Sequence, residues 1–177
     1  YAGDEGISGF ELWVLNLTDA LGPTRLGVFG REPAWSPDGS RIAFATGGGL
    51  RVLDLADSNV TPLTSDPSDA SPAWHPDGAS IVFERSALDG TSDLYEIGLA
   101  PGAAEVPSHA WAGDDLDPAF AAVGGGFAFA TQYGSPESPL QILASWPAGS
   151  WPSAEGRNPS WSQDGNQLAF DAYGAVY

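Results

Sequence analysis

Side chains able to perform acid–base or nucleophilic chemistry are few and scattered in this sequence. His75 and His109 are its two histidines, and it contains no cysteine. It also lacks a Gly-x-Ser-x-Gly segment, a His-Glu-x-x-His segment and a glycine-rich loop leading into a helix. The sequence therefore predicts no hydrolase triad, no metal centre built from Cys or His, and no cofactor. We expect a protein that is not an enzyme.

Carboxylates are abundant: 23 acidic residues face six arginines, for a net charge of -17. Asp114, Asp115 and Asp117 could supply oxygen ligands to Ca²⁺, but their loop lacks the ligand alternation and glycine of an EF-hand. A solvated loop is the favoured interpretation, with Ca²⁺ as the alternative. The arginines are isolated, so nucleic acid is not an expected partner, and no apolar run approaches the roughly 20 residues of a membrane span.

One phrase occurs three times and a degraded form of it occurs once. The copies carry an aromatic residue at Trp35, Trp74, Phe120 and Trp161, at intervals close to 40 residues. They read "PAWSPDGSRIAF" (33–44), "PAWHPDGASIVF" (72–83), "PAFAAVGGGFAF" (118–129) and "PSWSQDGNQLAF" (159–170). A period near 40 is the length of one four-stranded propeller blade.

Each copy predicts a β-hairpin. Proline can open a strand, Asp-Gly suits the positive φ of a primed turn, and the alternating run that follows predicts a second strand. The third copy has no Asp-Gly, which leaves its turn geometry open. Third strands are expected at 50–55, 93–99 and 140–145, and outer fourth strands at 60–64 and 104–107.

Repeat equivalence assigns structural roles to several candidate catalytic residues. His75 stands where the sister copies carry Ser36 and Ser162, which predicts a packing role in the blade. Likewise, the aspartates of the repeated turns are expected to bond to the backbone rather than to act as acids or bases. These are Asp38, Asp77 and Asp164.

The repeated phrases, with the strands "LRVLDL" and "TPLT" that follow the first, resemble the TolB-type β-propeller repeat. The resemblance covers nearly the whole chain. It implies an all-β propeller whose blades surround a central channel. In that family such rings bind proteins, gate a peptidase domain or frame a lyase site, outside the cytoplasm in the periplasm or beyond the cell.

The predicted blades form a single domain over 1–177 with a split blade at its ends, about four blades in all. The segments 10–17 and 24–29 match third and fourth strands, whereas the last copy supplies first and second strands. The predicted divisions are half-blade 1–30, blades at about 31–65, 70–108 and 116–155, and half-blade 157–177.

Three arrangements of these half-blades are open. They could meet in one molecule as a four-bladed ring, belong to a larger ring, or pair between molecules in a head-to-tail filament. The residues expected at such a junction are Phe10, Leu12, Val14, Leu15, Leu168, Phe170 and Val176.

Loops before the first strands should surround the channel mouth, at 29–32, 65–71, 112–117 and 154–158. The binding residues expected there are Asp66, Asp69, Asp114, Asp115, Asp117 and Arg157. Asn16 and Asn59 fit the N-glycosylation sequon. The sequence thus predicts a module for protein binding or assembly outside the cytoplasm, whose partner could be a copy of itself. The alternatives are a filament subunit and an accessory propeller of a larger peptidase or lyase.

Overall fold

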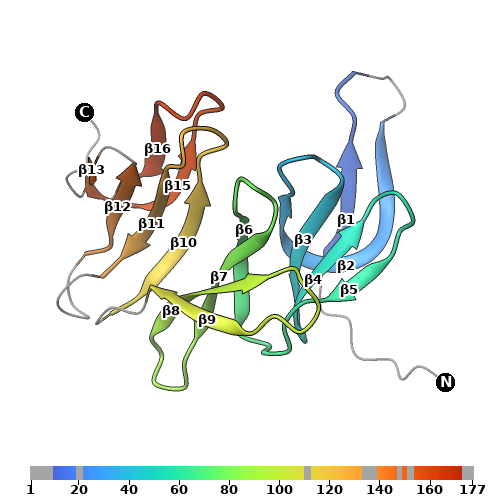
Figure 1. Cartoon of the computed structure of the whole chain (residues 1–177), viewed down its shortest axis with the longest axis horizontal. Helices are drawn as coiled ribbons and strands as arrows, with labels where there is room; N and C mark the ends of the chain where they lie inside the picture. Colours follow the sequence, from blue (N-terminus) through green and yellow to red (C-terminus); the bar gives the residue numbers. More distant parts are fainter. Residues whose placement is uncertain are drawn as a thin grey trace.

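A computed structural model gives the architecture of the chain, which is built from antiparallel β-sheets (Figure 1). It describes residues 10–18, 22–109, 113–132, 139–146, 149–150 and 154–172. Within these ranges there are sixteen strands and no helix. The predicted all-β class is confirmed.

The strands form four groups in chain order. The first sheet contains β1 (Phe10–Leu15), β2 (Pro23–Trp35), β3 (Arg41–Thr46), β4 (Gly49–Asp54) and β5 (Val60–Pro62). The second contains β6 (Asp69–Trp74), β7 (Ser80–Ser86), β8 (Ser92–Gly98) and β9 (Glu105–His109). The third contains β10 (Asp115–Phe120), β11 (Phe127–Thr131), β12 (Gln141–Trp146) and β13 (Gly149–Ser150), with β14 (Ala154–Glu155) also paired to β12. The last contains β15 (Arg157–Trp161) and β16 (Leu168–Asp171).

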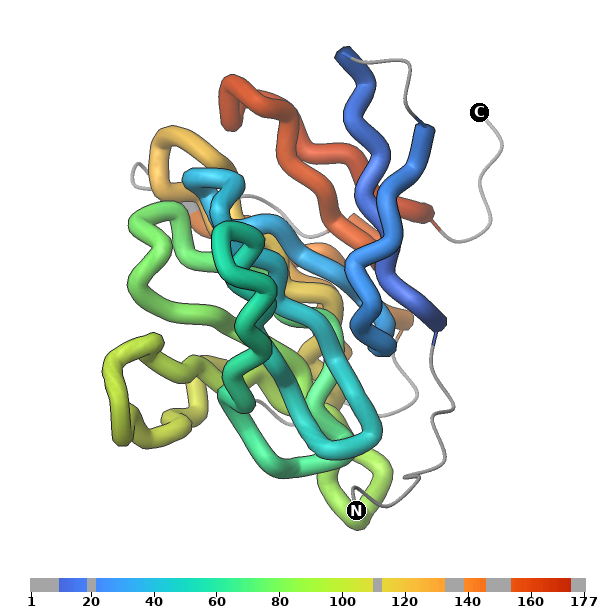
Figure 2. The backbone as a smooth tube through the Cα atoms, turned by 90° about the vertical axis from the view of Figure 1, so that its right-hand side faces the viewer, coloured from blue at the N-terminus to red at the C-terminus, as the bar shows by residue number. Residues whose placement is uncertain are grey.

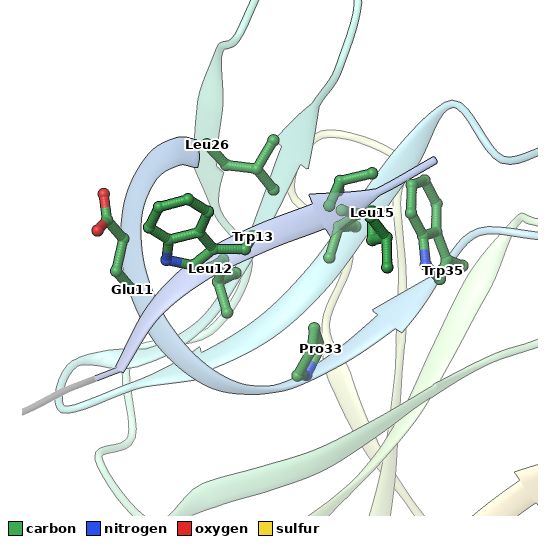
Figure 3. Close-up of a pocket in the computed structure, with 9 residues that line it drawn as sticks. Glu11, Leu12, Trp13, Leu15, Leu26, Pro33 and Trp35 are labelled. Atoms are coloured by element: carbon green, nitrogen blue, oxygen red, sulfur yellow. The ribbon is translucent and has the colours of Figure 1, made fainter. Parts of the chain in front are cut away.

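Strand β2 belongs to two successive units of the repeat. Its residues 23–30 pair with β1, and its residues 31–35 pair with β3. The sequence predicted two separate strands here. They are continuous because Gly30 pairs with Phe10 of β1 and the next residue, Arg31, already pairs with Ala45 of β3. Gly27, at φ 69°, lets the strand bend, and Figure 3 shows how strongly β2 curves.

The repeated hairpin turns differ from the predicted primed type. Gly39, Gly78 and Gly165 all have φ near 70°, but the aspartates before them do not have positive φ. In the first copy, the Gly39 N–H donates to the Ser36 carbonyl and the Ser36 N–H donates to the Arg41 carbonyl. The turn is therefore an ordinary reverse turn followed by one left-handed glycine, so only the glycine position demands a special backbone.

The degraded third copy still forms its hairpin. Phe120 pairs with Phe127, and the Ala121 N–H donates to the Gly126 carbonyl. Gly124 and Gly125 both have positive φ, at 82° and 70°. Two flexible glycines thus replace Asp-Gly in reversing the chain.

Aromatic residues join neighbouring sheets. Trp74 of β6 is 6% exposed, and its indole N–H donates to the Ala34 carbonyl of β2 at 3.0 Å. Trp161 of β15 repeats this bond to the Ala119 carbonyl of β10 at 3.2 Å. Ala43, Leu50, Ile81 and other apolar residues of the first two sheets form the largest core cluster around Trp74.

The two half-blades do not meet. β1 is paired only with β2, and β15–β16 form a separate two-stranded sheet among the described strands. In Figure 1 they stand at opposite ends of the row of sheets, and Figure 2, viewed from the β1–β2 end, shows the row end-on. The four-bladed ring closed within one chain, which the sequence left open, is therefore not the arrangement of this structure. Val176 lies outside the described residues.

Replacing Trp74 by alanine should destabilise the fold by about 3–5 kcal/mol, because it removes a buried aromatic body together with an inter-sheet hydrogen bond. Trp35, which occupies the equivalent position but is 51% exposed, is the matched control, and Trp35→Ala should cost roughly 1 kcal/mol. Urea unfolding of the dilute chain would measure both. Equal losses would contradict the assigned role of Trp74.

Candidate functional site

Two of the predicted channel-mouth residues are buried. Asp69 begins β6 and Asp115 begins β10, and each has 0% exposure. Asp69 is paired across the sheet with Arg85, and Asp115 with Thr131. Their burial does not fit the expectation that these two aspartates contact a partner.

Asp69 instead anchors a charged network inside the second blade. The Arg85 guanidinium donates to both Asp69 carboxylate oxygens, at 2.6 and 2.9 Å, and also to Glu105 of β9. The Thr64 hydroxyl donates to Asp69 as well. Hydrogen bonding to Asp69 raises the pKa of the Arg85 guanidinium, despite the opposing effect of burial, so the guanidinium remains charged. The guanidinium also stacks 4.9 Å from the centre of the Tyr95 ring.

The other predicted acidic residues are half-buried and already bonded. The Ser68 backbone N–H and hydroxyl donate to Asp66, and these bonds lower the pKa of its carboxyl. Asp114 accepts a hydrogen bond from the Ser92 N–H. Asp117 accepts from the Arg157 side chain at 3.2 Å, so these two predicted residues do lie together.

Asp114 and Asp117 therefore bond to different partners, whereas Asp115 is buried. In the described part of the chain, no group of three or more His, Asp or Glu side chains is placed to hold a metal ion.

A bulge with left-handed backbone precedes each aromatic anchor, and the sequence reasoning missed it. Glu32, Ser71, Asp117 and Asn158 all have φ between 47° and 54°. Each bulge falls where the ladder of a first and second strand shifts register. The sequence feature that marks the bulge is a polar residue directly before the proline of every copy. Glu and Ser, found in two of the copies, are not the residues that adopt positive φ most readily.

These bulges are joined to the preceding blade by carboxylates. The Ser71 N–H donates to Glu32 at 2.9 Å, the Asp117 N–H to Glu84 at 2.7 Å, and the Asn158 N–H to Asp117 at 3.1 Å. Burial raises the pKa of Glu84, and the bond from Asp117 partly offsets this rise. Several acidic residues thus connect blades.

The histidines have structural surroundings. His75 Nδ1 lies 2.8 Å from Asp77, as the Ser36 hydroxyl lies 2.6 Å from Asp38. His75 therefore replaces serine in the turn, as the repeat predicted. The hydrogen bond from Ser36 is the main cause that lowers the pKa of Asp38 to about 2.

His109 is half-buried against aromatic rings. Its ring centre lies 4.7 Å from that of Phe129 and 5.5 Å from that of Phe127, and burial lowers its pKa. These contacts place the imidazole in the packing between the second and third sheets.

An exposed groove lined mainly by apolar residues lies beside β1, shown in Figure 3. It has a volume of about 320 Å³. Trp13, Leu15 and Trp35 line it and are 50%, 56% and 51% exposed. The remaining lining residues are Glu11, Leu12, Val14, Leu26, Pro33 and Ile42.

The residues predicted to form a junction divide between the two ends of the row. Leu12 is buried against Phe44 and Leu53 of the first blade, whereas Phe10 is 82% exposed. Phe170 of β16 is 38% exposed. Val14 and Leu168 are half-buried. Four of these side chains belong to β1, and two of the four, Phe10 and Leu15, are exposed.

Solved structures reproduce this arrangement of sheets. TolB from Acinetobacter baumannii superposes with a TM-score of 0.72 at 20% identity, covering 93% of this chain and 44% of that protein. The fold is a TolB-like β-propeller. A putative TolB from Agrobacterium tumefaciens gives a TM-score of 0.67 at 18% identity, covering 87% of this chain and 62% of that protein. The chain thus spans less than two thirds of the length of either structure, which fits a partial propeller.

One enzyme shares the TolB-like fold more distantly. Dihydro-heme d1 dehydrogenase NirN in complex with DHE gives a TM-score of 0.54 at 15% identity, covering 81% of this chain and 32% of that protein. No protein-family model matches the chain, and no curated protein matches it. Across the described residues, no helix is long and apolar enough to cross a membrane.

Asp69→Asn should destabilise the protein by about 3–5 kcal/mol, because it leaves Arg85 facing a neutral partner in a buried site. Asp66→Asn is the matched control. Its carboxylate is 44% exposed and lies 3.8 Å from the same guanidinium, so a loss of about 1 kcal/mol or less is expected. Thermal unfolding compares the two variants, and a tolerated Asp69→Asn would contradict the structural role of this pair.

Glu84→Gln should raise the melting temperature at pH 7, by about 2–4 °C if the gain is near 1 kcal/mol. Because the folded pKa of Glu84 is raised, its favourable contribution is complete at acidic pH and is lost as pH rises through that pKa. Glutamine keeps an acceptor for the Asp117 N–H but cannot ionise. The difference between the two proteins should therefore shrink toward pH 3; a constant difference would contradict it.

Proposed function

We propose that this chain is a non-enzymatic propeller module that binds a protein partner through the groove beside β1. The observation that carries the proposal is the exposure of Trp13, Leu15 and Trp35 on one connected surface. Large apolar side chains exposed together usually mark an interaction site. Tryptophan is also the residue type most enriched among energetically dominant contacts.

The backbone of β1 adds a second mode of recognition. β1 has a hydrogen-bonded neighbour on one side only, β2, so its other edge is free of strand pairing within the described sheets. An extended segment of a partner can add to such an edge, with its alternate side chains entering the groove. The partner that fits this surface is therefore a β-strand with apolar residues on one face.

A binding role is also favoured by the chemistry of the polar residues. Asp69, Asp117 and Glu84 are engaged in contacts within or between blades, and His109 is packed among phenylalanine rings. These groups support the fold, which argues for a protein that is not an enzyme. The propeller part of a larger peptidase or lyase is the alternative role.

We place the module outside the cytoplasm, in the periplasm or secreted, on the resemblance of its repeats to the TolB type. Asn16 and Asn59 are exposed, as glycosylation would require, although the Asn16 side chain accepts hydrogen bonds from Thr18 of its own sequon. The half-exposed Asp66, Asp114 and Arg157 remain a secondary binding surface in this proposal.

A selection of displayed random peptides tests the binding role directly. Peptides would be selected on the wild-type chain and then measured against Trp13→Asn and Leu15→Asn. We expect extended peptides with alternating apolar residues, and at least tenfold weaker binding to either variant, because each replaces an exposed apolar contact with a polar group.

Leu88→Asn is the matched control, since Leu88 is fully exposed in a loop remote in sequence from β1. It should bind the selected peptides as the wild type does. Peptides that bind all four proteins equally, or no enrichment at all, would overturn the groove as a binding site.

A further inference from the structure

We propose that the groove beside β1 binds the β15–β16 hairpin of a second copy of this chain, so that two half-blades form one four-stranded blade. This inference rests on the proposed protein-binding function and names its partner. The repeat supports it, because the intact blades show which strands, hydrogen bonds and side-chain pairs a complete junction between two half-blades requires.

The two half-blades supply complementary strands. Leu12 of β1 is buried, as Leu50 of β4 and Leu94 of β8 are, and each begins the apolar part of a strand that pairs with an outer strand. β1 and β2 thus correspond to third and fourth strands of a blade. β15 and β16 are joined by the repeated turn and correspond to first and second strands. Together they make one blade with no strand missing or duplicated.

The tryptophan bonds identify the acceptor that would complete the junction. Trp74 donates to the carbonyl of Ala34, and Trp161 donates to the carbonyl of Ala119. Each acceptor directly precedes the aromatic anchor of the preceding blade, so the equivalent acceptor for Trp35 is Ser160. Trp35 is 51% exposed, and Ser160 is exposed while Ala34 and Ala119 are half-buried. Donor and acceptor are thus uncovered at opposite ends of the same chain.

The strand register follows from the intact blades. Leu168 pairs with Trp161 as Ile42 pairs with Trp35, and Ile42 in turn pairs with Leu53 of β4. Applying this register to the junction sets β16 opposite β1 in three pairs. These are Leu168 with Leu15, Ala169 with Val14, and Phe170 with Trp13.

The predicted pairs cover side chains that are now exposed. Phe170 opposite Trp13 would repeat the pair of Phe83 and Tyr95, whose rings stack with centres 6.1 Å apart. Ala169 is exposed, but its equivalents Ala43, Val82 and Ala128 in the three intact blades are 0–2% exposed. The open face of β16 therefore has the composition of a blade interior.

A carboxylate is also placed for the bulge of the first blade. Glu84 accepts the Asp117 N–H, and Asp171 occupies in β16 the position of Glu84 in β7. Asp171 is exposed and stands beside Asn158, which donates to it at 2.7 Å. In the junction it would accept the backbone N–H of Glu32, the first bulge residue.

A second copy is favoured over the same chain because β1 and β16 belong to different sheets at opposite ends of the row (Figure 1). The rows of sheets between them are packed through buried residues such as Trp74 and Phe129, which hold the ends apart. Joining β1 of one copy to β16 of a second copy leaves the packing within each copy unchanged.

Cysteine variants test the register between copies, because the natural chain contains no cysteine. Val14→Cys and Ala169→Cys would be prepared as separate proteins, each checked for wild-type thermal unfolding, then mixed and oxidised mildly. Directly opposed residues bring their Cβ atoms within about 4.5–5.5 Å, close enough for a disulfide after small adjustment. We expect a covalent dimer of one copy of each variant.

Val14→Cys mixed with Phe170→Cys is the matched control. A shift of one residue moves the thiol to the opposite face of the strand, so at least tenfold less dimer is expected. No dimer above this control would overturn the inference. So would a double variant, Val14→Cys with Ala169→Cys, that forms its disulfide only within one chain.

Light scattering provides a readout that needs no cysteine. The wild type should exceed the 18.3 kDa monomer mass at high concentration, Ala169→Arg should remain a monomer, and Leu88→Arg should behave as the wild type. A monomeric wild type would overturn the second copy as partner. Peptides selected on the groove would still support the binding function in that case, so the two proposals can fail separately.

Discussion

Tryptophan anchors tie blades of this protein together, since Trp74 and Trp161 each donate a hydrogen bond to a carbonyl of the preceding blade, and the rest of the architecture depends on this contact. Trp74 is buried in a cluster that includes residues of the preceding blade, and Ala34 of that blade accepts its indole hydrogen bond. A blade alone would leave this surface exposed to water, since a face of a sheet is buried only when another element packs against it. Each blade is therefore stabilised by packing against its neighbours, and a terminal blade is packed on one side only.

Acidic residues take part in this dependence, which changes how the high carboxylate content should be interpreted. Glu32, Glu84 and Asp117 each accept a backbone N–H from a bulge in the following blade. Such bonds satisfy donors that the irregular strand ladder leaves without a strand partner. Asp69, in contrast, accepts hydrogen bonds from Arg85 of the same blade. A concentration of acidic side chains near the first strands is thus compatible with a purely structural purpose.

The fold could be predicted from sequence because its signals are local and repeated. The interval near 40 residues, the proline before each aromatic anchor and the turn glycines indicate four-stranded units, and the antiparallel sheets and the likeness to TolB structures confirm the propeller. Turn type was predicted wrongly, since Asp-Gly also suits a turn in which glycine alone is left-handed. The continuity of β2 was missed because residues 29–32 were expected to form a loop between two strands, whereas Gly30 and Arg31 pair with β1 and β3 in succession.

The candidate site was harder to anticipate, because burial depends on what lies across the sheet. Asp69 and Asp66 are equally polar in sequence, yet only Asp69 lies opposite Arg85 in the strand register and is enclosed. The apolar residues of β1 were expected at a junction, whereas the exposure of Trp35 was not. Trp35 is exposed because, among the described strands, no first strand of a preceding blade lies over it as one does over Trp74. The repeated phrase does not encode such a long-range contact.

The ion pairs of the arginines have an electrostatic consequence for any encounter of this molecule with another. Arg25 pairs with Glu11, Arg31 with Glu32, Arg85 with Asp69, and Arg157 with Asp117, so at least four of the six arginines are held close to carboxylates. The outer field of the molecule is therefore dominated by unneutralised carboxylates. Two such bodies repel at long range and attract only on apolar contact. Because the Debye length falls from about 30 Å at 0.01 M to about 8 Å at 0.15 M ionic strength, salt should speed their encounter, the reverse of a complex formed between opposite charges.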